Sequence, residues 1–356
     1  MNETSRQRGL RDGSADLLKG FAVLFMVQVH IMEQLASPDT FNSLAGKISM
    51  FLGGPPCAPV FLGVMGYFLA TSPKPVSYFL KRGLLLFIGG IVLNSARSAN
   101  LLIRIATGEV DLDPLFFIMG ADILTLAGVS MALMGVIRLV FRNNGFLYLF
   151  SAVVFVVLSP LMSRIVITGA PGFITAFLWG NQPWAYFPLF PWFAYVLVGY
   201  AFRLIQQSTL SGKINIQNQI IYFIPLWLWV FFTLPYAGRI THNLEGGGGY
   251  YHHGALFFGW VLLFMVSYAA LMKLVDQFYG EQRIIQLIKW MGKKVTTLYV
   301  IQWLIIGNLA TWLYKSQDLL QYIAWFTGVT LVTLLTGMFV EKIREKVSSR
   351  KVRTSG

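Results

Sequence analysis

The sequence predicts an all-α protein that is embedded in a membrane and crosses it with about ten helices. Hydrophobic residues make up 56% of the chain and charged residues only 12%, and the mean hydropathy is +0.62. Soluble domains typically contain about 25% charged residues, so this composition excludes an ordinary soluble fold. The apolar residues also gather in runs long enough to span a bilayer, separated by shorter polar segments.

The ten apolar runs are candidate transmembrane helices. They lie at residues 15–36, 48–71, 77–97, 116–139, 145–166, 186–207, 218–236, 254–274, 294–314 and 319–341. No cleavage site follows a short apolar core at the N-terminus, so we expect the first run to be retained as a span. An even number of spans places both chain termini on the same side of the membrane.

The distribution of basic residues predicts which side that is. All but six of the 28 Lys and Arg residues fall on the side of the termini, and the six are Lys47, Arg97, Arg104, Arg164, Arg239 and Lys315. Basic residues concentrate in cytoplasmic loops, so both termini are predicted to be cytoplasmic. We therefore expect a cytoplasmic arm (1–14), one membrane domain (15–341) and a basic cytoplasmic tail (342–356).

Charge and cysteine content exclude other classes. The net charge of +13 would suit nucleic-acid binding only if basic residues clustered on a folded, water-exposed face. Here they lie in short loops between apolar runs, as a topology signal requires, so no nucleic-acid partner is expected. The single cysteine, Cys57, excludes an internal disulfide framework and a cysteine-based metal cluster.

The first apolar run contains ionisable residues inside a segment fit to span the bilayer. Lys19 and His30 are eleven residues apart, so they share one helix face and lie about 16 Å apart along the axis. Glu33 follows three residues later, within reach of the imidazole. Such groups inside a membrane usually mark a functional site. The alternative is structural: a snorkelling lysine, a histidine satisfied by a neighbouring helix and a glutamate at the outer interface.

The second run contains helix breakers in its outer half. Residues 53–59, GGPPCAP, hold two glycines and three prolines, where a continuous helix would lose backbone hydrogen bonds. One interpretation is a broken helix beside a polar site next to His30. The other is that Pro55 and Pro56 end an outer loop and Pro59 begins the helix.

The third and fourth runs add charged and polar candidates. Lys81 and Arg82 lie at the expected cytoplasmic edge, where paired cations can hold phosphate groups or simply anchor the helix. Asn94 and Arg97 lie near the outer interface, and Asp122 follows in the fourth run. We expect Asp122 to be an inward-facing carboxylate paired with Arg97.

The connection between the seventh and eighth runs is the most polar outer loop. The spacing of its four candidate metal ligands, His242, Glu245, His252 and His253, does not match a standard metal motif, so no metal is expected. The four glycines suggest a flexible lid or acceptor-site loop, and an inert loop is the alternative. The ninth run has Lys293 and Lys294 at its inner end and Gln302 among aromatic residues.

Four stretches together resemble a known superfamily. They are the R-x4-D-x2-K-G-x9-H pattern from Arg11 to His30, APVFLGVMGYFLA at 58–70, FPLFPWFAYVLVGYAF at 187–202 and MGKKVTTLYVIQW at 291–303. They are similar to the transmembrane acyltransferases, above all bacterial proteins related to heparan-α-glucosaminide N-acetyltransferase. The acyltransferase-3 O-acetylases are more distant and share the basic-x10-histidine spacing. Two departures are Lys19, where Arg is commoner, and Gln302, where relatives often have His.

The resemblance implies acyl transfer from cytoplasmic acyl-CoA, with acetyl-CoA as the expected donor, to a hydroxyl or amine of an extracytoplasmic glycan. Lys19, Lys81 and Arg82, with Lys293 and Lys294 as further candidates, would then hold the CoA phosphates. His30 would act as general base or transient acyl carrier, oriented by Glu33 or Asp122. Asn94, Arg97, His253 and Gln302 are the residues expected to contact the acceptor.

A second function remains open at this stage. Buried His, Glu and Asp residues also form proton relays, so a proton-coupled transporter or a lipid flippase without acyl chemistry is the alternative. A transporter would be expected to contain a pair of interrupted runs in corresponding halves of the chain, and this chain contains none.

We expect a multi-pass protein of a bacterial inner membrane surrounded by lipids. The sequence leaves the acceptor and the oligomeric state open, and a homodimer is one arrangement that it allows.

Overall fold

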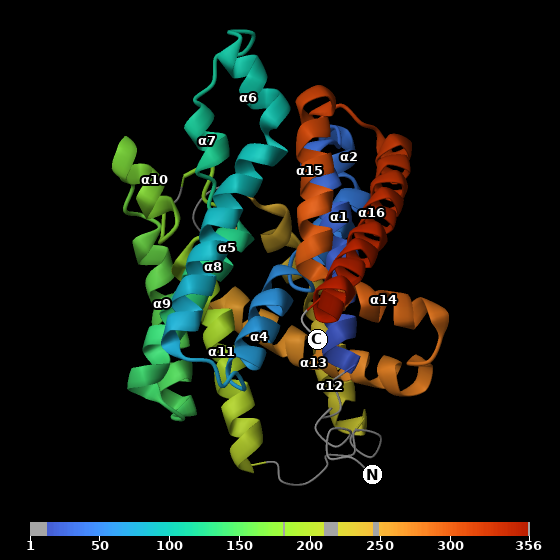
Figure 1. Ribbon diagram of the computed structural model, residues 1–356. Coiled ribbons are helices and arrows are strands. Elements are labelled where there is room, and N and C mark those ends of the chain that lie inside the picture. The colour runs from blue at the N-terminus through green and yellow to red at the C-terminus, as the bar shows by residue number, and fades with distance from the viewer. Residues whose placement is uncertain (1–12, 181, 210–219, 245–248, 355–356) are drawn as a thin grey trace.

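The computed structural model describes residues 13–180, 182–209, 220–244 and 249–354. Over this part of the chain it is an all-helical bundle with ten helices or helix pairs long and apolar enough to span a membrane, which confirms the predicted fold class (Figure 1). The described residues contain no strand, and Ala36 and Gln317 form an isolated bridge. The protein is therefore a multi-pass membrane protein.

The helices fall close to the predicted runs. In chain order they are α1 (Gly13–Gln34), α2 (Pro38–Asn42), α3 (Leu44–Gly53), α4 (Ala58–Leu69), α5 (Val76–Arg97), α6 (Ala99–Ala106), α7 (Pro114–Ile118), α8 (Ile123–Phe141), α9 (Gly145–Met162), α10 (Ala170–Ala176), α11 (Leu189–Thr209), α12 (Ile220–His242), α13 (Ala255–Tyr279), α14 (Arg283–Lys293), α15 (Val295–Leu313) and α16 (Leu319–Thr354). The predicted boundary between membrane domain and tail, at 341/342, falls inside α16, which continues without interruption.

Helix α1 is the centre of one half of the bundle. It packs against α3, α13, α14, α15 and α16, and 72% of its membrane-spanning window is buried, the largest share among the described candidate spans. The other half is formed mainly by α4, α5, α8, α9 and α11, in which α5 packs on α8 and α11 packs on both α4 and α9 (Figure 1). A central helix surrounded by protein can carry polar side chains that a lipid-facing helix could not.

The second span is broken, as one of the two sequence interpretations predicted. Helix α3 ends at Gly53, residues 54–57 form a turn, and α4 begins at Ala58. Pro55 and Pro56 occupy the turn because proline lacks the amide hydrogen that a continuous helix needs. The break thus places the C-terminal end of one helix and the N-terminal end of another inside the bundle.

The fourth span differs from its predicted limits. The sequence suggested a helix over 116–139, but α7 ends at Ile118 and α8 begins only at Ile123. Asp122 is the N-cap of α8, and its Oδ1 accepts a hydrogen bond from the Ile123 amide at 2.6 Å. Aspartate is a preferred N-cap residue because its side chain satisfies a free amide at the helix start. Asp122 therefore lies at a helix end and not within a helix.

Glycines bring neighbouring helices into backbone contact. A Cβ at Gly199 in α11 would overlap the carbonyl oxygen of Gly63 in α4. A Cβ at Gly292 would similarly overlap the Asp16 carbonyl oxygen, where α14 crosses α1. Small residues allow this close approach between membrane helices, so these contacts fix the helix positions around the centre of the bundle.

Replacing Gly199 with alanine should therefore separate α4 from α11. We expect Gly199→Ala to destabilise the protein by about 1–3 kcal/mol, because a packed interface must open to admit the methyl group. Gly259→Ala is the matched control, since no atom lies within 4 Å of the position that a methyl group on that helical glycine would occupy. The melting temperature of both purified variants in detergent tests this, and an unchanged value for Gly199→Ala would contradict it.

Candidate functional site

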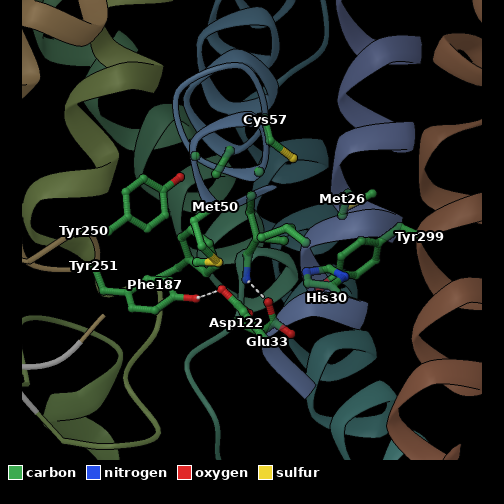
Figure 2. A pocket seen from close by; sticks show the side chains of 15 residues that line it. Met26, His30, Glu33, Met50, Cys57, Asp122, Phe187, Tyr250, Tyr251 and Tyr299 are labelled. Carbon is green, nitrogen blue, oxygen red and sulfur yellow. Dashed lines mark hydrogen bonds between the residues drawn. The ribbon is translucent and has the colours of Figure 1, made fainter. Parts of the chain in front are cut away.

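Two of the three polar candidates of the first span, His30 and Glu33, line a cavity inside the bundle. Side chains and backbone from α1, the α3–α4 break, the start of α8, α15 and two interhelical loops surround it (Figure 2). The lining residues are Met26, Val29, His30, Glu33, Met50, Gly53, Gly54, Cys57, Ala58, Asp122, Ile123, Phe187, Tyr250, Tyr251 and Tyr299. The structure thus brings all three predicted catalytic residues, His30, Glu33 and Asp122, to one cavity.

His30 is held by two neighbouring residues of α15. Its Nδ1 atom lies 3.2 Å from Nε2 and 3.4 Å from Oε1 of Gln302, which is fully buried. The imidazole also packs on the Trp303 ring, with 3.9 Å between ring centroids. The amide can donate from Nε2 to an unprotonated Nδ1, or accept through Oε1 from a protonated Nδ1, which leaves the ring Nε2 as the basic nitrogen. Gln302, which we expected to contact the acceptor, is thus the residue that orients His30.

The second polar element is a buried ion pair. Arg97 at the end of α5 and Asp122 at the start of α8 are 2.7 Å apart, with 11% and 7% of their side chains exposed. This confirms the predicted pairing. The Arg97 guanidinium also lies over the Trp303 ring, 4.2 Å from its centroid, so the pair is joined to the residue that packs on His30.

Glu33 is bonded to an aromatic residue of the loop between α12 and α13. Its Oε1 accepts a hydrogen bond from the Tyr251 hydroxyl at 3.2 Å. The Tyr251 carbonyl oxygen in turn accepts from the Trp192 indole at 2.8 Å. Among the described residues, the hydrogen-bond partner of the His30 imidazole is Gln302, and no hydrogen bond joins the imidazole to Glu33 or Asp122, the residues expected to orient it.

None of the four residues expected to contact the acceptor lines the cavity. Arg97 and Gln302 contact side chains that do line it, Asp122 and His30, and the other two are bonded elsewhere. Asn94 is buried and donates to the carbonyl oxygens of Ile118 at 3.2 Å and Gly120 at 2.8 Å, which fixes the chain leading to Asp122. His253 is fully buried, with Nε2 2.9 Å from the Tyr195 hydroxyl and Nδ1 2.8 Å from the Tyr250 carbonyl oxygen. Both residues therefore hold the walls of the cavity in place.

The loop between α12 and α13, predicted to be an outer loop, forms part of the cavity wall. Tyr250 and Tyr251 line the cavity, and the His252 Nε2 atom lies 2.9 Å from the Gly180 carbonyl oxygen, which ties the loop to the segment after α10. Glu245 lies outside the described residues, and the described ones hold no cluster of metal-binding side chains. The loop is therefore attached to the bundle through its aromatic and histidine residues.

The basic residues expected to bind the donor are not gathered at the cavity. Lys19 forms an ion pair of 2.9 Å with Asp16, and Lys294 is paired with Glu341. The remaining three, Lys81, Arg82 and Lys293, are exposed. Lys19 lies on α1, on the same uninterrupted helix as His30.

Sequence reasoning missed three tyrosines of the cavity: Tyr250, Tyr251 and Tyr299. The first two follow the four glycines of the outer loop, and adjacent aromatic residues in a polar loop are the signal that could have identified them. Tyr299 lies in an apolar run rich in aromatic residues and gave no separate signal.

A half-buried histidine and two carboxylates thus lie together at one cavity inside the bundle of a multi-pass membrane protein. The family model of heparan-alpha-glucosaminide N-acetyltransferase, catalytic, matches residues 11–232. The chain belongs to this family of transmembrane acetyltransferases, as its sequence motifs suggested. No curated protein matches the chain. The matched region includes His30, Glu33 and Asp122, while Tyr250 and Gln302 lie beyond it.

The histidines of the outer loop should make the fold sensitive to acid. Burial lowers the pKa of His253 from 6.5 to about 4 and also lowers the pKa of His252. The unfolded chain takes up these protons near pH 6.5, so stability should be full above that pH and fall as the pH drops toward 4. Replacing both histidines with glutamine should flatten the decrease in melting temperature between pH 7 and pH 4.5. An equally steep decrease in the double variant would contradict this.

Proposed function

We propose that the protein transfers an acetyl group from cytoplasmic acetyl-CoA to an amine or hydroxyl of a sugar on the other side of the membrane, with His30 as the general base. The observation that carries the proposal is the position of His30. It lines a cavity inside the bundle, with Nδ1 next to the Gln302 amide. In the proposed state Oε1 of Gln302 accepts from Nδ1–H, and the ring Nε2 accepts the proton of the acceptor. Membership in an acetyltransferase family supplies the reaction class.

The proposed reaction is a direct transfer. The acceptor nitrogen or oxygen attacks the thioester carbonyl carbon while His30 takes its proton. The tetrahedral intermediate then collapses, the carbon–sulfur bond breaks, and the proton passes from His30 to the departing CoA sulfur. The imidazole is returned to its neutral form at the end of the cycle.

The two carboxylates would have separate tasks in this cycle, one near the charged imidazolium and one near the acceptor. Asp122 is neutralised by Arg97, and both lie near Trp303, on which the His30 ring packs. Their pair would stabilise the imidazolium without adding an unpaired charge to the cavity. Glu33 lines the cavity with one oxygen bonded to Tyr251, so its carboxylate could accept hydrogen bonds from the acceptor amine or hydroxyl groups.

The donor would approach from the end of the bundle where α1 begins. Lys19 lies about 16 Å from His30 along the helix axis, a span compatible with the extended arm of CoA. Phosphate binding by Lys19 would require an exchange of its Asp16 partner, whereas the exposed Lys81 and Arg82 can meet phosphates directly. Lys293 and Lys294 are further candidates at the same end, and Lys294 would first have to leave Glu341.

Removal of the base tests the proposal. His30→Ala should lower the turnover number for transfer from acetyl-CoA to glucosamine by about 10²–10⁴-fold, because general base catalysis contributes about this factor. Calorimetric binding of acetyl-CoA should persist in the variant. His242→Gln is the control, since this histidine lies at the end of α12 and does not line the cavity. A fully active His30→Ala variant would exclude His30 as the base, and folded wild-type protein that does not bind acetyl-CoA would favour the transporter alternative.

Neutralising the exposed cations tests the donor side. The double variant Lys81→Gln, Arg82→Gln should raise the Michaelis constant for acetyl-CoA by roughly tenfold, equivalent to about 1.4 kcal/mol of binding free energy. The Michaelis constant for glucosamine should stay close to the wild-type value. Lys47→Gln is the control, an exposed lysine of α3 on the predicted outer side. Unchanged acetyl-CoA kinetics would remove Lys81 and Arg82 from the donor site.

A further inference from the structure

The N-terminal end of α4 opens onto the cavity without a cap. The helix has 12 residues, its N-cap Cys57 makes no side-chain hydrogen bond to the helix start, and Cys57 and Ala58 line the cavity. Among the described residues, none accepts a hydrogen bond from the Ala58 or Val60 amide, and Pro59 between them has no amide hydrogen. The start of a helix carries a partial positive charge, so this end favours a negatively charged partner.

The start of α8 faces the same cavity and is different. There Asp122 supplies a carboxylate that accepts from the Ile123 amide at 2.6 Å. The start of α8 is therefore already bonded to a carboxylate, whereas the start of α4 has no anionic partner in the described part of the protein. The difference indicates that the α4 end can accept an anionic atom from a bound ligand.

Tyr250 provides a second donor on the same cavity. Its side chain is 5% exposed, and its hydroxyl oxygen is buried without a hydrogen-bond partner among the described residues. Figure 2 shows this hydroxyl directed inward, toward the part of the cavity that Cys57 lines. A buried hydroxyl without a partner destabilises the folded protein, and a phenylalanine would avoid that loss. Packing alone therefore does not explain the hydroxyl.

The residue is also held in a fixed position. Its amide donates to the Asn243 carbonyl oxygen at 2.8 Å, and its own carbonyl oxygen lies 2.8 Å from Nδ1 of the buried His253. The Trp192 ring meets the Tyr250 ring edge-on at 5.3 Å between centroids. A donor that is fixed before substrate binds loses no further freedom when charge develops beside it.

We propose that the uncapped N-terminal end of α4 and the Tyr250 hydroxyl form an oxyanion site for the carbonyl oxygen of the acetyl thioester. This inference rests on the proposed acetyl transfer and assigns Tyr250 a catalytic role in it. As the acceptor attacks the carbonyl carbon, the carbon–oxygen double bond becomes a single bond and the electron pair moves to the oxygen. Tyr250 donates its hydroxyl hydrogen to that oxygen, and the α4 amides and helix dipole stabilise its charge until the carbon–sulfur bond breaks.

The variant Tyr250→Phe tests the donor. We expect the turnover number with acetyl-CoA and glucosamine to fall by about 10²–10³-fold, as for loss of one oxyanion donor, while calorimetric binding of CoA stays at the wild-type affinity. Tyr268→Phe is the matched control, because Tyr268 also buries a hydroxyl without a partner among the described residues but does not line the cavity. Its turnover number should equal that of the wild type.

A substrate analogue provides a second measurement that does not depend on the variant's stability. In the dithioester of acetyl-CoA, sulfur replaces the carbonyl oxygen and is a weak hydrogen-bond acceptor. The wild type should turn over this analogue much more slowly than acetyl-CoA, and the ratio of the two rates should be closer to one in Tyr250→Phe. If the wild type turned over acetyl-CoA and its dithioester at the same rate, the oxyanion site would be overturned.

The outcomes separate this inference from the proposed function. Active wild-type protein with an unimpaired Tyr250→Phe variant would overturn the oxyanion role and leave acetyl transfer intact. Folded wild-type protein that binds no acetyl-CoA and releases no CoA would overturn the acetyl transfer itself, and the oxyanion site with it. A Tyr268→Phe variant as impaired as Tyr250→Phe would show a general packing effect and would also overturn the catalytic role of Tyr250.

Discussion

The buried ion pair of Arg97 and Asp122 is the interaction on which the cavity depends. Asp122 caps α8 and pairs with Arg97 at the end of α5, and Arg97 lies over Trp303 of α15. Trp303 in turn packs on His30 of α1. Four helices thus meet through one charge pair. Removing one partner would leave an uncompensated buried charge, a loss of about 3–5 kcal/mol in proteins.

Besides the ion pair, the polar cavity depends on the break in the second span. Residues 54–57 interrupt the helix, and Gly53 allows the break to lie against α1, since a Cβ there would overlap the Val29 side chain. Irregular backbone inside a membrane protein is tolerated only where protein or a cavity surrounds it. The prolines therefore place two helix ends at the cavity, and one of them, the start of α4, has no side-chain cap.

The two halves of the chain contribute differently to the site. The family match ends at residue 232 and contains the proposed base and both carboxylates. Gln302 and Trp303, which hold the imidazole, and Tyr250 and Tyr251, which close the cavity, come from later in the chain. The proposed base and both carboxylates thus lie in the matched region, whereas the residues that hold the imidazole and the proposed oxyanion donor Tyr250 lie outside it.

The sequence by itself determined the class of the protein, the number of spans and the position of His30 in the first of them. Composition and run length are properties of the chain that folding does not alter, so these predictions needed no knowledge of helix packing. The proline and glycine cluster allowed two interpretations, and the Arg97–Asp122 pair followed from similar depth in adjacent spans. Tertiary structure alone decided that Gln302, 272 residues away, bonds His30, that Tyr251 bonds Glu33, and that the Tyr250 hydroxyl has no partner among the described residues. The physical reason is that helix periodicity specifies which face is buried, whereas the partner of that face depends on side-chain shape and close glycine contacts between helices far apart in sequence.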